Sequence, residues 1–143
     1  MRFLIQCVDE ASVQVDGNVT GAIEKGFLVL IGISDTDDTQ IADRMIKKML
    51  GLRIFEDENH KTNLSLSDVE GSLLLVSQFT LYANCKKGNR PSFVRAGKPE
   101  HANQLYEYII EQTRQSVIFG ADMKVSLVND GPFTIMLDSE ELF

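Results

Sequence analysis

The chain has 143 residues, of which 43% are apolar and 24% charged, with a formal net charge of −7 and a sequence pI of about 4.8. These values are typical of a globular protein, and the length favours one domain over residues 1–143. The negative charge argues against broad binding to a phosphate backbone, so we expect no DNA partner, but it allows a grip on one short nucleic-acid end. No run of ~18 apolar residues could span a membrane, and the N-terminus turns polar by Gln6 without a cleavage site. We therefore expect a cytoplasmic protein with no membrane partner.

The first half of the chain predicts strands followed by a helix. Residues 3–8 are typical of a first strand, and residues 12–23 alternate around Asp16-Gly17, which predicts a hairpin. Residues 26–33 are continuously apolar, as in a strand covered on both faces. Residues 36–50 change to a helical period, with acidic residues near the start and a glycine after the end.

The second half predicts further strands and one more helix. Residues 52–57 favour a short strand, residues 58–63 a polar turn, and residues 71–83 the clearest strand of the chain. Pro99 suits the first turn of a second amphipathic helix, which we expect to end near Ser116. Residues 123–129 and 133–139 predict two strands around Gly131-Pro132. Many strands with two helices indicate an α/β layered domain in which the helices cover one face of a sheet.

A search for common reactive motifs finds little. His60 and His101 are far apart, and neither belongs to a metal-binding pattern, so we expect no metal and no cofactor. Cys7 and Cys85 are the only cysteines and are expected to be free thiols. The chain lacks phosphate-binding glycine loops and the GxSxG motif.

Two stretches keep both a structural and a functional interpretation. On a strand, Ser77, Phe79 and Leu81 would face one way, and Gln78, Thr80 and Tyr82 the other. This polar face is either solvent-facing or offers hydroxyl, amide and backbone N–H groups to a ligand. Residues 86–98 carry five basic residues and no acidic one, which fits a solvated loop or a rim for an anionic partner.

Together, SQFTL at residues 77–81 and NDGPFT at residues 129–134 resemble the two signature motifs of the D-aminoacyl-tRNA deacylase family. The segments MRFLIQ, ASVQVDG, GFLVLIGI, LRIFED, NLSLSDV, KKGNRPSF and FGADMKVSLVNDGP resemble that family in the same order, so the likeness covers nearly the whole chain. It implies mostly antiparallel and mixed, barrel-like sheets with two helices covering one face. It also implies a homodimer that needs no cofactor and hydrolyses the ester of D-aminoacyl-tRNA, and of glycine mischarged on tRNA.

The resemblance also implies roles for particular residues. Gly131-Pro132 would form a cis peptide that projects into the partner subunit's pocket and rejects L-aminoacyl groups by steric exclusion. The acyl group would lie near Ser77, Gln78, Phe79 and Thr80, and Met123 would line the pocket. Thr80 lacks an obvious general base nearby in the sequence, so we expect the terminal 2′-OH of the RNA to assist water. The backbone N–H of Phe79 or Thr80 would then stabilise the oxyanion.

Lys86, Lys87 and Arg90 are candidate contacts to tRNA phosphates. The chain departs from the family pattern in two places: Cys7 stands where relatives usually have an arginine that helps to fix the Gly-Pro loop, and the connection before FGADM is shorter. Two alternatives stay open at this point: a non-catalytic tRNA- or nucleic-acid-binding module on the same fold, and a small-ester hydrolase that uses Thr80.

Overall fold

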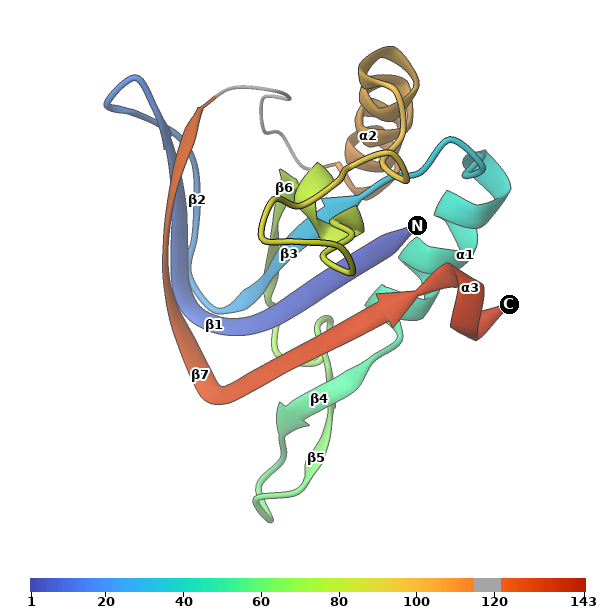
Figure 1. Ribbon diagram of the computed structural model, residues 1–143. Coiled ribbons are helices and arrows are strands. Elements are labelled where there is room, and N and C mark those ends of the chain that lie inside the picture. Colours follow the sequence, from blue (N-terminus) through green and yellow to red (C-terminus); the bar gives the residue numbers. More distant parts are fainter. Residues whose placement is uncertain (115–121) are drawn as a thin grey trace.

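The computed structural model describes residues 1–114 and 122–143 (Figure 1). Its strands are β1 (Arg2–Val15), β2 (Asn18–Ile23), β3 (Gly26–Gly32), β4 (Arg53–Glu56), β5 (Thr62–Ser65), β6 (Ser72–Ser77) and β7 (Met123–Asp138). Its helices are α1 (Thr39–Leu50), the 3-10 helix η1 (Phe79–Tyr82), α2 (Pro99–Thr113) and α3 (Ser139–Leu142). No helix in the described part of the chain is long and apolar enough to cross a membrane.

The long strand β1 organises the main sheet. β7 runs antiparallel to it from Arg2 to Val15, while the other edge of β1 pairs first with β3 and then with β2. β6 joins β3 in parallel. The sheet curls into a half-barrel, with the helices gathered on one side (Figure 1), so the expected mixed α/β architecture is confirmed. The predicted hairpin at Asp16-Gly17 is also confirmed: both residues have positive φ, 49° and 79°.

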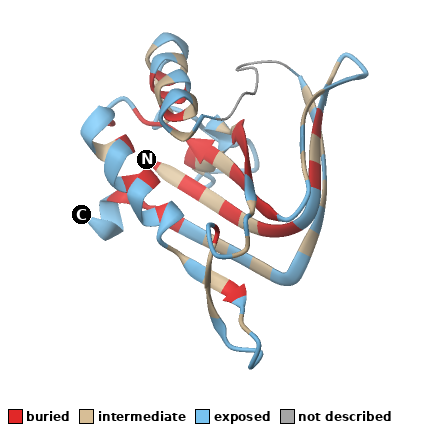
Figure 2. Cartoon of the chain, turned by 180° about the vertical axis from the view of Figure 1, so that it is seen from behind, coloured by how far each residue is buried: buried red, intermediate tan, exposed pale blue. Residues whose placement is uncertain are grey.

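Two apolar clusters form the core of the described chain. The larger lies between the sheet and the helices and includes Phe27, Val29 and Ile31 of β3. The smaller includes Leu28 of the same strand. Successive residues of β3 therefore enter different clusters, which explains its continuous apolar run and confirms a strand covered on both faces. Buried residues lie along the central strands and on the helix faces toward them (Figure 2).

The helix boundaries follow local signals. The Asp38 side chain caps α1 by accepting from the Ile41 N–H at 2.8 Å, Gly51 is its C-cap, and Pro99 opens α2. Asp37, one of the two acidic residues near the expected helix start, is buried instead, and its carboxylate lies 2.6 Å from the amino group of Met1. α2 ends at Thr113. The expected end near Ser116 and the shortened connection beyond it lie outside the described residues.

The structure corrects the expectation of one strand over residues 71–83. β6 stops at Ser77, and the chain turns into η1 after a last sheet bond from the Gln78 N–H to the Ile31 carbonyl at 2.7 Å. The Leu81 N–H then donates back to the Gln78 carbonyl at 3.2 Å, and the Tyr82 side chain is buried. The predicted alternation of side chains from Ser77 to Tyr82 is therefore wrong.

The end of the chain needs two smaller corrections. The two strands expected around Gly131-Pro132 are one element, β7, which continues through the bend. The last predicted strand also stops at Asp138 rather than at Ser139. Ser139 begins the short helix α3, where the Asp138 side chain accepts from the Glu140 N–H at 3.1 Å.

Candidate functional site

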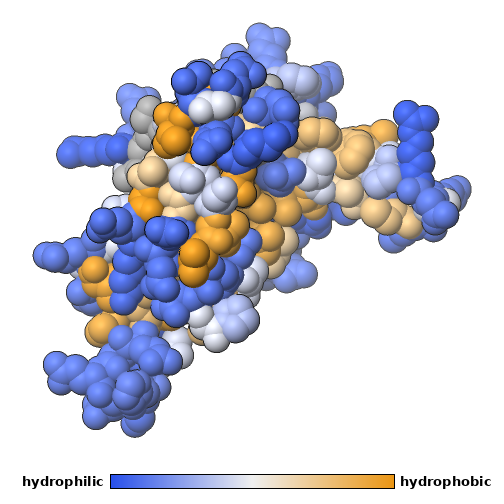
Figure 3. Space-filling model, turned by 90° about the vertical axis from the view of Figure 1, so that its left-hand side faces the viewer, coloured by the Kyte–Doolittle hydropathy of each residue, from blue (hydrophilic) through white to orange (hydrophobic). Residues whose placement is uncertain are grey.

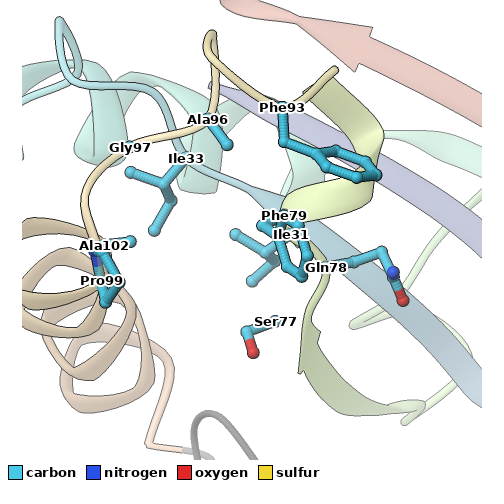
Figure 4. A pocket seen from close by; sticks show the side chains of 10 residues that line it. All are labelled: Ile31, Ile33, Ser77, Gln78, Phe79, Phe93, Ala96, Gly97, Pro99 and Ala102. Atoms are coloured by element: carbon cyan, nitrogen blue, oxygen red, sulfur yellow. The ribbon is translucent and has the colours of Figure 1, made fainter. Parts of the chain in front are cut away.

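A cavity of about 480 Å³ opens where β6 passes into η1 (Figure 4). Four elements or segments contribute its walls: β3 and the residue after it, the β6–η1 junction, residues 93–97, and the first turn of α2. The lining residues are Ile31, Ile33, Ser77, Gln78, Phe79, Phe93, Ala96, Gly97, Pro99 and Ala102. The walls are mostly apolar with a few polar groups at one side, the usual composition of a small-molecule site.

A close backbone approach holds the segment 93–97 against β3. The Gly97 N–H donates to the Ile33 carbonyl at 2.8 Å. A Cβ atom at Gly97 would lie 3.1 Å from the Ile33 carbonyl oxygen and from the Ser34 carbonyl carbon. A glycine at this position therefore lets the segment close the cavity.

Two phenylalanines flank the cavity mouth. Phe79 is 56% exposed and Phe93 is 37% exposed, and their rings meet edge to face with centroids 5.1 Å apart. Large apolar side chains that stay exposed beside a cavity are suited to contact a ligand. Phe79 was predicted from the sequence to lie near the acyl group and to offer its backbone N–H. Phe93 was not singled out, although an aromatic residue within a basic loop is a usable signal.

The structure brings Ser77, Gln78 and Phe79 together at the cavity and places Thr80 beside them, outside its lining. The Gln78 side-chain amide donates to the Thr80 hydroxyl. Within the described chain, the backbone N–H groups of Phe79 and Thr80 have no hydrogen-bond acceptor, and neither a histidine nor a carboxylate bonds the Thr80 hydroxyl. The site thus offers two free backbone donors but no base beside its hydroxyl.

Arg2 contacts η1 and helps to hold it in place, a role that was not predicted from the sequence. Its Nη1 donates to the Leu81 carbonyl at 2.8 Å, its Nε donates to the Asp138 carboxylate at 2.7 Å, and its guanidinium lies 4.6 Å from the centre of the Tyr82 ring. Burial raises the pKa of Tyr82 to about 12. Burial alone would also raise the pKa of Asp138, but bonds from the Glu140 N–H and Arg2 outweigh it and lower that pKa.

Gly131 and Pro132 lie away from this cavity. Their peptide bond is cis, as expected, both residues are exposed, and Gly131 has a φ of +124°. Neither lines the cavity. β1 and β3 stand between β7 and β6, and three strand spacings amount to roughly 14 Å. In Figure 1 the bend of β7 is a projecting corner of the sheet.

The other residues named from the sequence are also apart from the cavity. Met123 begins β7 opposite Val15 and packs against the smaller apolar cluster. Lys86, Lys87 and Arg90 are exposed on a loop closed by paired Asn84 and Ser92 backbone bonds of 2.7 and 3.0 Å, and they form no ion pair with any described residue. Cys7 and Cys85 are free thiols, as expected.

Metal-binding side chains do not cluster at the cavity. The described residues include no group of three or more histidine, cysteine, aspartate or glutamate side chains placed to hold a metal ion. His60 is exposed and contacts Glu56 at 3.3 Å, and His101 lies in the first turn of α2.

Comparison with known proteins places the whole chain among named relatives. Residues 4–138 match the family described as D-Tyr-tRNA(Tyr) deacylase. The D-aminoacyl-tRNA deacylase of Koribacter versatilis is 52% identical over the full length of both chains. That of Geotalea uraniireducens is 54% identical, covering 97% of this chain and 94% of the relative.

Two solved structures share the fold. The structure titled c-Myc DNA Unwinding Element Binding Protein superposes with a TM-score of 0.90 at 41% identity, covering 96% of this chain and 98% of that one. A probable eukaryotic D-amino acid tRNA deacylase superposes with a TM-score of 0.78 at 18% identity, covering 95% and 97%. The second likeness concerns the fold alone.

Proposed function

The chain belongs to the D-Tyr-tRNA(Tyr) deacylase family, a family of hydrolases, and we propose that it hydrolyses the ester bond of D-aminoacyl-tRNA. The products are the free D-amino acid and tRNA. The observation that carries this proposal is the match over residues 4–138, which includes both the cavity-forming SQFTL segment and the Gly131-Pro132 bend. Glycine mischarged on tRNA is a second substrate, because it also lacks an L side chain.

The proposed mechanism uses backbone donors at the β6–η1 junction. The aminoacyl end of the tRNA enters the cavity, with Ser77, Gln78 and Phe79 around the ester. The free N–H of Phe79 or Thr80 stabilises the oxyanion of the tetrahedral intermediate. The terminal 2′-OH of the RNA assists the attack of water on the ester carbonyl. Thr80 is not the nucleophile, since its hydroxyl has the Gln78 amide and no general base beside it.

Chiral selection uses the Gly131-Pro132 bend of a second protomer. The bend is exposed and remote from the cavity of its own chain. It can therefore contact a bound acyl group only in the cavity of another copy of the chain. Its main-chain carbonyls face the α-carbon of the acyl group and leave room for hydrogen but not for an L side chain. Exposed Val128 and Met136 on β7, each 47% exposed, support contact between copies. Figure 3 shows that side of the molecule, where apolar residues lie among hydrophilic ones.

The basic loop meets the tRNA outside the cavity. Lys86, Lys87 and Arg90 are free to approach phosphates next to the 3′ end, and such contacts are weakened by salt. Contact with only this end is compatible with the net charge of −7. A protein that edits aminoacyl-tRNA acts in the cytoplasm, where translation takes place.

The direct test compares D-tyrosyl-tRNA with L-tyrosyl-tRNA. We expect hydrolysis of the D ester only, and little reaction when the terminal 2′-OH is replaced by hydrogen. Hydrolysis of the deoxy substrate at the same rate as the normal D ester would disprove assistance by the RNA. Tight nucleic-acid binding without turnover would favour a non-catalytic binding module instead, an alternative suggested by Cys7 in place of an arginine.

A further inference from the structure

The strand β7 leaves its pairing with β1 at the Gly131-Pro132 bend. Gln6 faces Thr134 and Val8 faces Asn129, so that Cys7 alone stands opposite residues 130–133. Four residues of β7 therefore bulge from the sheet where β1 has one. A bulge of this kind loses ladder hydrogen bonds, and other groups must fix its direction.

The side chain of Asn129 closes the base of this bulge. Its Nδ2 donates to Gln6 Oε1 at 2.6 Å and to Thr134 Oγ1 at 3.1 Å, and its Oδ1 accepts from the Phe133 N–H at 2.7 Å. One amide thus joins both ends of the bulge to each other and to β1. Among the described residues, no other side chain hydrogen-bonds to residues 130–133.

The underside of the bulge is held by apolar packing. Phe133 is half-buried against the larger core cluster, to which Cys7 also belongs. Burial, followed by the nearby charge of Asp130, raises the pKa of Cys7 to about 11. The thiol is therefore neutral at pH 7, so it adds packing but no charged hydrogen bond of the kind an arginine would give.

We propose that Asn129 is the positioning residue that sets the direction in which Gly131 and Pro132 present their carbonyl groups. The inference rests on the proposed function, because the bend matters only if it selects the acyl group. Gln6 assists by supplying an acceptor oxygen from β1, the central strand of the sheet. In this chain, with a thiol at position 7, the amide provides the side-chain hydrogen bonds that hold the bend.

The first test measures stereoselectivity. Asn129→Ala removes all three bonds, and we expect the ratio of kcat/KM for D-tyrosyl-tRNA to that for the L ester to fall about tenfold or more, the effect of losing one or two net hydrogen bonds. The fall should come from a faster L reaction, with KM for the D ester little changed. Ser126→Ala is the control on β7, since Ser126 pairs with Ser12 in the regular part of the ladder, outside the bulge.

Substitutions at Gln6 separate positioning from general loss of stability. Gln6→Met keeps the side-chain length but removes the acceptor, so it should lower the D-to-L ratio, though less than Asn129→Ala. Gln6→Glu keeps an acceptor oxygen for Asn129 and should retain the wild-type ratio. The thermal midpoint of unfolding of each variant is measured in parallel, and a value close to that of the wild type shows that the fold is intact.

The second test is independent of activity. The Phe133 amide is bonded to Asn129 Oδ1 and lies outside the regular ladder. We expect Asn129→Ala to speed its hydrogen exchange about tenfold or more, with core amides such as Val29 unchanged.

The outcomes distinguish this inference from the proposed function. If the wild-type protein hydrolyses neither ester, the proposed function fails. If it is selective for the D ester, an Asn129→Ala chain with wild-type D-to-L ratio and wild-type exchange at Phe133 overturns the role of Asn129. A lower ratio in Asn129→Ala and in Gln6→Met, restored in Gln6→Glu, supports it.

Discussion

The cavity and the β7 bend are held in place by different forces. The cavity walls come from segments far apart in the chain and continue the larger core cluster. Ile31, Ile33 and Ala102 both line the cavity and belong to that cluster. The bend is exposed, and one side-chain amide joins its two ends. Packing of many residues is insensitive to small polar changes, whereas the direction of a bend set by three side-chain hydrogen bonds depends on the one residue that makes them. Substrate binding and stereoselectivity should therefore respond to different substitutions.

The largest expected effect is on the cavity side. Phe79→Ala removes half of the aromatic pair at the mouth, and kcat/KM for D-tyrosyl-tRNA should fall about 10- to 100-fold, the usual value of one aromatic contact to a base or apolar group. Stability should change little, since the ring is 56% exposed. Steady-state kinetics on both esters measure the loss, and Val94→Ala is the control because that side chain is 84% exposed and outside the lining. An equal loss in both variants would contradict a specific role for Phe79.

A substitution in the bend should change the selectivity for D over L esters rather than the turnover of the D ester. Gly131 has a φ of +124°, and a Cβ atom there would lie 3.0 Å from the Phe133 nitrogen. Gly131→Ala must therefore shift the bend, and we expect about a tenfold lower D-to-L ratio with nearly normal hydrolysis of the D ester. Competition assays with mixed D and L esters measure the ratio directly. A variant that loses D activity while still rejecting the L ester would show that the bend serves catalysis rather than selection.

The smallest expected effect concerns how the free energy of unfolding depends on pH through Asp138, the carboxylate that pairs with Arg2 next to η1. The pKa of Asp138 is lowered in the folded chain, so its contribution is complete above the unfolded value near 3.8 and is lost as pH falls through the folded value. Asp138→Asn should lower the free energy of unfolding at pH 7 by about 1–2 kcal/mol, because Arg2 loses its charged partner. Urea titrations from pH 7 to pH 3 should show this difference shrinking. A constant difference would mean that the pairing with Arg2 contributes little.

The sequence predicted the parts of the fold that depend on local signals. Alternating apolar residues indicated the strands, and Asp38, Gly51 and Pro99 marked helix boundaries that the structure has. It failed at residues 78–83, whose composition suits a strand. Their turn depends on a bond from Arg2 to the Leu81 carbonyl and on burial of Tyr82, contacts that bridge about half of the chain.

The candidate site was predicted only in part for the same reason. The SQFTL and NDGPFT motifs pointed to Phe79 and to Gly131-Pro132, but the contribution of Gly97 and Ala102 follows from tertiary packing alone. The sequence motif contains Asn129, yet the bond from this residue to Gln6 spans 123 positions and cannot be inferred from local patterns.

Mixing two variants tests most directly whether the cavity and the bend of one site belong to different protomers. Ala102→Phe should fill the cavity and abolish hydrolysis while leaving the bend intact. Gly131→Ala chains should hydrolyse both esters. When they are co-refolded with excess Ala102→Phe chains, L-ester hydrolysis per Gly131→Ala chain should fall toward the wild-type level while D-ester hydrolysis persists, because each working cavity then faces an intact bend. A D-to-L ratio that stays the same at every mixing proportion would contradict a site shared between subunits.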